Sequence, residues 1–207
     1  MIFPIFYAGP VYYYAHLIGQ ENISFEIWEN FTKQTPRNRC TIDGPNDVTS
    51  LVIPIKKTAS KMKMGDVEIA YEENWQHNHW QAIQSAYGTS PYFEFYDYLF
   101  ENIYQSEPKK LIDFNLALHQ IIMKCLNFNV EYSLTSTFQS IENESDYRLK
   151  FNVKQHRFCE ELPEYFQVFG DRHDFRKNLS ILDLIFNLGP ESRTYLLNVK
   201  ENYLNKD

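Results

Sequence analysis

Residues 2–27, IFPIFYAGPVYYYAHLIGQENISFEI, decide the fold. The run at residues 2–7 is short and apolar, as a strand is, and a helix-period pattern follows between Pro10 and Gly19. A proline at the start and a glycine just past the end are the expected boundary residues of a helix. Residues 23–27 alternate apolar and polar side chains, which is typical of a half-buried strand. The stretch therefore predicts strand, helix and strand, with the two strands parallel in one sheet.

A β-hairpin is predicted next. Residues 40–42 and 51–55 are short apolar segments, and residues 43–47 (DGPND) between them are rich in turn formers. The chain is therefore predicted to be α/β, with a mixed sheet, a parallel β-α-β start and a block of helices. An α+β arrangement is the alternative, because the hairpin is antiparallel.

The remaining sequence alternates between helical and strand-like patterns. Helices are predicted over residues 75–88, 91–104, 107–126 and 181–188 and after Gly189-Pro190, and strands over residues 67–71, 129–135, 149–153 and 165–169. Ser180 with Asp183 resembles a capping box. With no repeat and no Gly/Ser-rich linker, we expect a single domain, residues 1–207. It divides into an α/β part (1–72), a helical part (73–127), and strands followed by helices (128–207).

The composition excludes several classes of protein. A net charge of −7 and a pI of about 5.4 argue against nucleic-acid binding over a broad face. No run of 18 apolar residues predicts a transmembrane helix, and the first residues lack the charged region of a signal peptide. Three widely spaced cysteines, Cys40, Cys125 and Cys159, form neither a metal pattern nor an even disulfide set. We therefore expect a cytoplasmic protein with reduced thiols.

One basic cluster stands out in this acidic chain. Lys33, Arg37, Asn38 and Arg39 fall within eight residues around a proline, so their side chains are expected on a loop or strand entry. Guanidinium groups two residues apart, with an amide between them, suit the binding of phosphate or carboxylate. The alternative is that the arginines pair with internal carboxylates. The candidate carboxylates for that pairing are Glu26, Glu29 and Asp43.

The sequence resembles the WbqC-like family of bacterial proteins. The matching segments are Gly9-Pro10, residues 29–34, residues 37–40, residues 51–55, Trp75 with His79, Ala86-Tyr87, Pro91, Phe93, residues 178–183 and Gly189-Pro190. The resemblance implies a role in O-antigen or related polysaccharide synthesis and a transferase that moves an acyl or aminoacyl group, such as glycine, to an amino sugar. The implied partner is a nucleotide-linked or lipid-linked sugar. A non-catalytic binding or scaffold protein of the same pathway is the alternative. No cofactor is identified.

The catalytic candidates follow from residue chemistry. His79 is the candidate general base, or else a histidine packed on Trp75 with one nitrogen bonded to backbone. Cys40, beside a guanidinium, is the candidate nucleophile, or else a small buried apolar residue. Trp75 and Tyr87 join the basic cluster as candidate substrate-binding residues. No metal site is expected, because residues two apart on a helix, such as His77 and His79, point about 200° apart and cannot chelate one ion.

Overall fold

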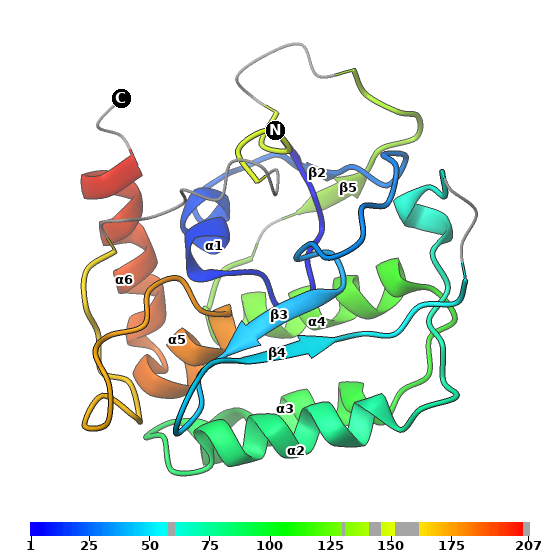
Figure 1. Cartoon of the computed structure of the whole chain (residues 1–207). Helices are drawn as coiled ribbons and strands as arrows, with labels where there is room; N and C mark the ends of the chain where they lie inside the picture. Colours follow the sequence, from blue (N-terminus) through cyan, green and yellow to red (C-terminus); the bar gives the residue numbers. More distant parts are fainter. Residues whose placement is uncertain (58–60, 130, 141–145, 152–161, 205–207) are drawn as a thin grey trace.

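The structure is a computed structural model of the whole chain (Figure 1). It describes residues 1–57, 61–129, 131–140, 146–151 and 162–204. Strand β1 (Ile2–Phe3), helix α1 (Val11–Leu17) and strand β2 (Ile23–Phe25) form the predicted β-α-β unit, and the two strands pair in parallel. Strand β5 (Tyr132–Leu134) pairs in parallel with the other side of β2. The parallel start is confirmed.

The predicted hairpin is also present. Strands β3 (Arg39–Ile42) and β4 (Thr49–Val52) pair antiparallel, with Arg39 opposite Val52. In the described residues this pair forms a sheet of its own beside the sheet β1-β2-β5. Parallel and antiparallel pairing together with the helices confirm the predicted fold class. Figure 1 shows the hairpin in the middle of the molecule, with α2 and α3 on the side away from the parallel sheet.

The three helices of the helical block form as predicted, and one boundary differs by more than two residues. Helices α2 (Trp75–Tyr87), α3 (Phe93–Tyr104) and α4 (Leu111–Cys125) pack successively on one another. Helix α4 starts four residues later than expected. Pro108 disfavours helix at the residue before it, and the carbonyl of Lys109 accepts a 3.0 Å hydrogen bond from the Ile69 amide.

The C-terminal helices are α5 (Ile181–Leu188) and α6 (Glu191–Val199), followed by a π-helical turn (Lys200–Leu204). Ser180 caps α5, because its hydroxyl accepts a hydrogen bond from the Leu182 amide at 3.3 Å. Asp183 does not complete a capping box. Its carboxylate accepts hydrogen bonds from Tyr165 (2.5 Å) and Gln167 (2.9 Å) instead.

Three predicted strands are wrong where they are described. Residues 67–71 follow a 3₁₀ turn (Met64–Asp66) and make only isolated bridges, through Glu68 and Ile69. Residues 149–151 form a turn, and residues 152 and 153 lie outside the described part. Residues 165–169 have no strand partner, because Tyr165 and Gln167 direct their side chains to Asp183. In residues 67–71 and 165–169 the pattern reflects burial of single side chains rather than pairing of backbone, and in residues 149–151 only Phe151 is buried.

Aromatic side chains fill the core. Tyr7, Tyr13, Tyr14 and Tyr87 are fully buried, and the Tyr13 hydroxyl donates to the Pro4 carbonyl at 2.8 Å. The high tyrosine content therefore serves the interior, where each hydroxyl needs a polar partner. No helix in the described part of the chain is long and apolar enough to cross a membrane.

Candidate functional site

The predicted basic cluster is divided by the fold. Arg37 is buried, and its Nε and Nη2 atoms donate to Glu29 Oε1 at 2.9 and 2.7 Å. Asn38 is buried too, with its amide donating to the Ile53 carbonyl at 2.9 Å. Lys33 is exposed. The internal pairing of Arg37 is the alternative that the sequence left open, with Glu29 as the partner.

Arg39 behaves differently. It is half-buried, and no carboxylate lies within ion-pair distance of it in the described part of the chain. Its Nε atom is buried without a hydrogen-bond partner there. The side chain lines a pocket of about 200 Å³. This Arg39 pocket is lined by Ala8, Pro10, Pro36, Arg39, Cys40, Thr41, Asn178 and Ser180.

The turns before α1 and α5 build one wall of the Arg39 pocket. Ala8 and Asn178 have positive φ angles of 40° and 57°. The Asn178 side chain accepts from the Tyr12 amide at 3.0 Å, and the Ser180 hydroxyl donates to the Ala8 carbonyl at 2.7 Å. The amide of Ile181 donates to the Gly9 carbonyl at 2.9 Å. The two turns therefore hold each other in place beside Arg39.

A row of polar side chains leads from the pocket wall into the core. The Tyr7 and Ser180 hydroxyls lie close enough to the Cys40 thiol to lower its pKa. The Tyr7 hydroxyl lies 2.9 Å from His79 Nδ1 and 2.8 Å from the Tyr104 hydroxyl. His79 also bonds to the backbone of Val52. Tyr7 therefore joins the two catalytic candidates, Cys40 and His79.

Burial keeps both catalytic candidates uncharged. It lowers the pKa of His79 to about 4, although the bond to Val52 acts in the opposite direction. It raises the pKa of the Cys40 thiol to about 12, against the hydrogen bonds from Tyr7 and Ser180. Of these residues, Cys40 lines the Arg39 pocket, and Tyr7 and His79 do not. A molecule in the pocket would therefore contact Cys40 but not His79.

The other candidates do not line this pocket. Trp75 packs against His79, with ring centroids 5.1 Å apart, which matches the packing alternative for that histidine. The fully buried Tyr87 hydroxyl accepts from the Asp43 amide at 3.1 Å. On α2, His77 is exposed and His79 buried, so the two imidazoles face different surroundings. No group of three or more potential ligands in the described residues would hold a metal ion.

Sequence reasoning missed a buried charge cluster at the carboxyl ends of β2 and β5. Glu26 is fully buried and accepts from Thr135 (2.9 Å), Arg148 (3.1 Å) and two backbone amides. Arg148 also pairs with Asp146. Glu26 was named only as a partner for Arg37 or Arg39, and nothing in the sequence linked it to Arg148, 122 positions away.

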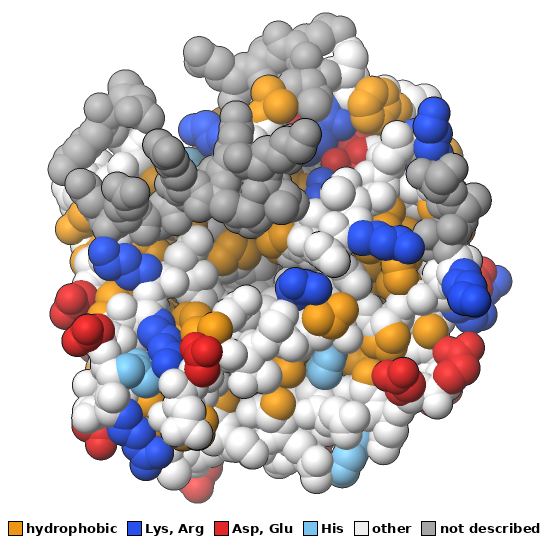
Figure 2. Space-filling view, viewed as in Figure 1, with side chains coloured by type: hydrophobic (Ala, Val, Ile, Leu, Met, Phe, Trp, Pro, Cys, Tyr) orange, Lys and Arg blue, Asp and Glu red, His pale blue; other side chains and the backbone are white. Residues whose placement is uncertain are grey.

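The surface charges are mixed on the face drawn in Figure 2. Lysine and arginine side chains lie in small groups among acidic ones, and the described part of this face shows no broad basic surface. Any anion would therefore be held locally, by a site such as the Arg39 pocket, rather than by a field over the whole face.

Comparison with known proteins identifies the family. The model of the WbqC-like protein family matches residues 13–157, more than two thirds of the 207-residue chain. The match includes Arg39, Cys40 and His79, but not Asn178 and Ser180 of the Arg39 pocket. Comparisons with curated proteins and with solved structures give no match. The chain belongs to the WbqC-like protein family.

Proposed function

We propose that the protein is a transferase of bacterial surface polysaccharide synthesis that moves an acyl or aminoacyl group, such as glycine, to an amino sugar. The observation that carries the proposal is the Arg39 guanidinium, which has no partner in the described part of the chain and lines a pocket that Cys40 also lines. The guanidinium binds the anionic group of a nucleotide-linked or lipid-linked substrate, since a half-buried cation without an internal partner favours an anionic ligand.

The chain Cys40–Tyr7–His79 supplies a route for the proton. Cys40 sulfur attacks the acyl carbon, and the bond from that carbon to the donor's leaving group breaks with its electron pair. The thiol proton passes to the Tyr7 oxygen while the Tyr7 proton passes to His79 Nδ1. The sugar amine then attacks the thioester carbon, and the carbon–sulfur bond breaks with its electron pair on sulfur. The proton on His79 returns through Tyr7 to the Cys40 sulfur, and the amine's proton passes to the released leaving group, directly or through solvent.

The resting protonation states favour a second candidate, a non-catalytic binding or scaffold protein of the same pathway. A proton moved from a thiol of pKa about 12 to an imidazole of pKa about 4 climbs on the order of 10 kcal/mol. A bound substrate would have to recover much of this cost. The scaffold candidate needs only the binding step at Arg39.

Two measurements separate these candidates. The first is calorimetric binding of nucleotide-linked amino sugars, in which Arg39→Ala should weaken affinity about tenfold or more and Arg172→Ala, at an exposed arginine, should not. The second follows product mass with activated aminoacyl thioesters as donors. Turnover should be lost in Cys40→Ala but kept in Cys125→Ala. Cys125 is a suitable control because it is buried, has a thiol pKa raised to about 12 and lies outside the Arg39 pocket.

The outcomes are distinct. Turnover that depends on Arg39 and Cys40 supports the transferase. Binding that depends on Arg39, without turnover with any donor, supports the scaffold protein. Full activity in Cys40→Ala would exclude the thioester route, and unchanged affinity in Arg39→Ala would remove the pocket from both candidates.

A further inference from the structure

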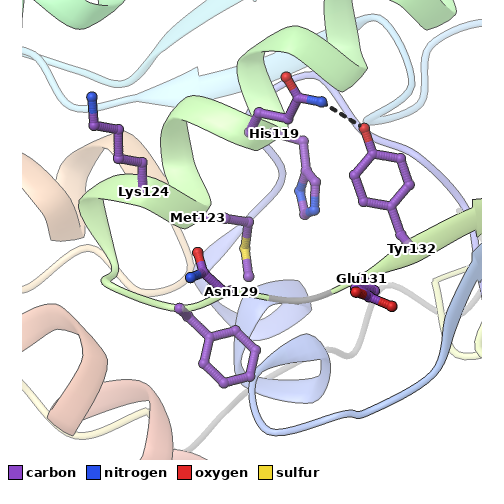
Figure 3. Close-up of a pocket in the computed structure, with 8 residues that line it drawn as sticks. His119, Met123, Lys124, Asn129, Glu131 and Tyr132 are labelled. Carbon is purple, nitrogen blue, oxygen red and sulfur yellow. Dashed lines mark hydrogen bonds between the residues drawn. The ribbon is translucent and has the colours of Figure 1, made fainter.

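A second cavity lies between the last turns of α4 and the start of β5, and none of its lining residues belongs to the Arg39 pocket (Figure 3). Its volume is about 460 Å³. Cavities of roughly 300–1,000 Å³ are the usual size for small-molecule sites. We call it the α4–β5 cavity.

The end of α4 shapes its apolar wall. Asn127 takes a positive φ of 48° directly after the helix, and the Phe128 amide donates to the Met123 carbonyl at 3.0 Å. This turn places Phe128 and Met123 on the cavity wall. Arg193 holds the turn from outside by donating to the Asn127 carbonyl at 3.1 Å. A polarizable thioether and an aromatic ring suit the face of a flat ligand.

A buried imidazole lies deeper in the cavity. His119 is only 2% exposed, and its ring packs edge-on against Phe25 at 5.1 Å and against Tyr132 at 5.9 Å. Burial lowers its pKa to about 4, so the ring is neutral at pH 7. Its Nδ1 atom is buried and has no hydrogen-bond partner in the described part of the chain. The ring therefore meets the cavity with its other edge, which carries Nε2.

The two ring nitrogens of His119 therefore differ in their surroundings, and this difference decides which of them carries the proton. A buried N–H without a partner is costlier than a buried lone pair without one. The proton of the neutral ring therefore belongs on Nε2, and His119 presents a donor to the cavity. Tyr132 presents a second donor, because its hydroxyl accepts from the Gln120 side chain at 2.9 Å and keeps its own proton free. The two charged residues on the lining, Lys124 and Glu131, are exposed and opposite in sign.

We propose that the α4–β5 cavity binds a neutral, flat ring that carries a carbonyl acceptor, such as a pyrimidine base or a nicotinamide. The carbonyl oxygen accepts from His119 and Tyr132, and the ring lies against Met123 and Phe128. A charged ring is excluded, because Lys124 and Glu131 are exposed, the described inner wall has no other charged group, and burying an unpaired charge is costly. The proposal is independent of the function assigned to the Arg39 pocket.

The test is NMR titration of the full chain with uridine, nicotinamide and toluene, observed at the ring C–H resonances of His119. Uridine or nicotinamide should produce a saturable shift. Toluene, which has the apolar ring but no acceptor, should bind at least tenfold more weakly. His119→Phe keeps a ring in the core and should weaken binding of the polar probe about tenfold, and Tyr132→Phe about three- to tenfold, as expected for the loss of one hydrogen bond each. For the variants, binding is read from the ligand resonances.

Matched controls use the same replacements at exposed positions on other helices. His77→Phe on α2 and Tyr98→Phe on α3 should leave affinity unchanged. Wild-type affinity in both His119→Phe and Tyr132→Phe would overturn the proposal, as would toluene binding as tightly as uridine and nicotinamide, or no saturable shift with either polar probe. If His119→Phe does not fold, the Tyr132→Phe result decides alone.

Discussion

Two charged regions of this molecule use arginine in opposite ways. At the carboxyl ends of β2 and β5, Arg148 is buried between Glu26 and Asp146, and nearby Arg37 is buried against Glu29. Arg39 follows Arg37 by two residues and lines the Arg39 pocket. Its guanidinium has no carboxylate partner in the described residues. A buried, fully paired arginine fixes structure, whereas a half-buried, unpaired one is available to a ligand. The density of charge in the sequence does not distinguish these two kinds of arginine. Their partners in the folded structure distinguish them.

Acid should destabilise the whole fold through its buried histidines, one of which is His79, and this is the largest effect that we expect. Burial lowers the pKa of His79 and His119 to about 4 and that of His16 to about 3, below the unfolded value of 6.5. The unfolded chain therefore binds more protons, and stability is lost as the pH falls from 6.5 towards 4. Asp183 opposes this trend, because its pKa is raised from 3.8 to about 6 and it binds a proton earlier in the folded state.

Three histidines against Asp183 give a net uptake of about two protons on unfolding, or ~2.7 kcal/mol per pH unit near pH 5. The raised pKa of Glu29 decreases this slope, and the lowered pKa of Glu68 increases it. Urea unfolding at a series of pH values measures this slope. His79→Gln should reduce it by about one proton, and His77→Gln, at an exposed position of the same helix, should not. A slope that His79→Gln leaves unchanged would contradict the neutral state assigned to His79.

Removing Arg148 should destabilise the fold at the charge cluster that Arg148 forms with Glu26 and Asp146. Arg148→Ala leaves Glu26 and Asp146 buried without their cation, and we expect a loss of about 3–5 kcal/mol in the free energy of unfolding. Urea unfolding at pH 7 checks this value. Arg172→Ala, at an exposed arginine, should stay within about 0.5 kcal/mol. If the two variants lose similar amounts of stability, the buried charge cluster of Glu26, Asp146 and Arg148 does not have the structural role that its burial indicates.

Arg39→Ala tests the other arginine of the comparison, the one that we expect to bind a ligand. Because the guanidinium has no partner among the residues that the structure describes, its removal should cost less than about 1 kcal/mol of stability. Filling the pocket with an anion should raise the stability of the wild type and not that of the variant. Thermal unfolding with and without inorganic pyrophosphate provides both measurements. A large loss of stability in the unliganded variant would show that Arg39 is a structural residue like Arg148.

Local signals predicted much of the fold. Pro10 and Gly19 bounded α1, and the turn-rich segment at residues 43–47 set the hairpin, because these residues act through their own backbone. The late start of α4 depended on pairing between Lys109 and Ile69, 40 positions apart, which no local pattern records. The false strands at residues 67–71 and 165–169 arose because single buried side chains imitate a two-residue period.

The candidate site was predictable only in its residue types. The cluster around Arg39 and the histidine on α2 were visible in the sequence, and pairing of Arg37 with Glu29 was among the alternatives. The link between Cys40 and His79 was not visible, because it passes through Tyr7, 72 positions before His79, in a chain with 15 tyrosines. Nor could the sequence say which arginine would find a carboxylate, since that depends on where distant strands end.

The most direct test observes the Nε–Hε groups of Arg37 and Arg39 by NMR while inorganic pyrophosphate is added. The two groups lie two residues apart and serve as each other's control. We predict a saturable shift at Arg39, whose Nε has no partner in the described ranges of the chain, and little change at Arg37, whose Nε donates to Glu29 at 2.9 Å. No saturable shift at Arg39, or equal shifts at both arginines, would contradict the claim that the Arg39 pocket binds an anion.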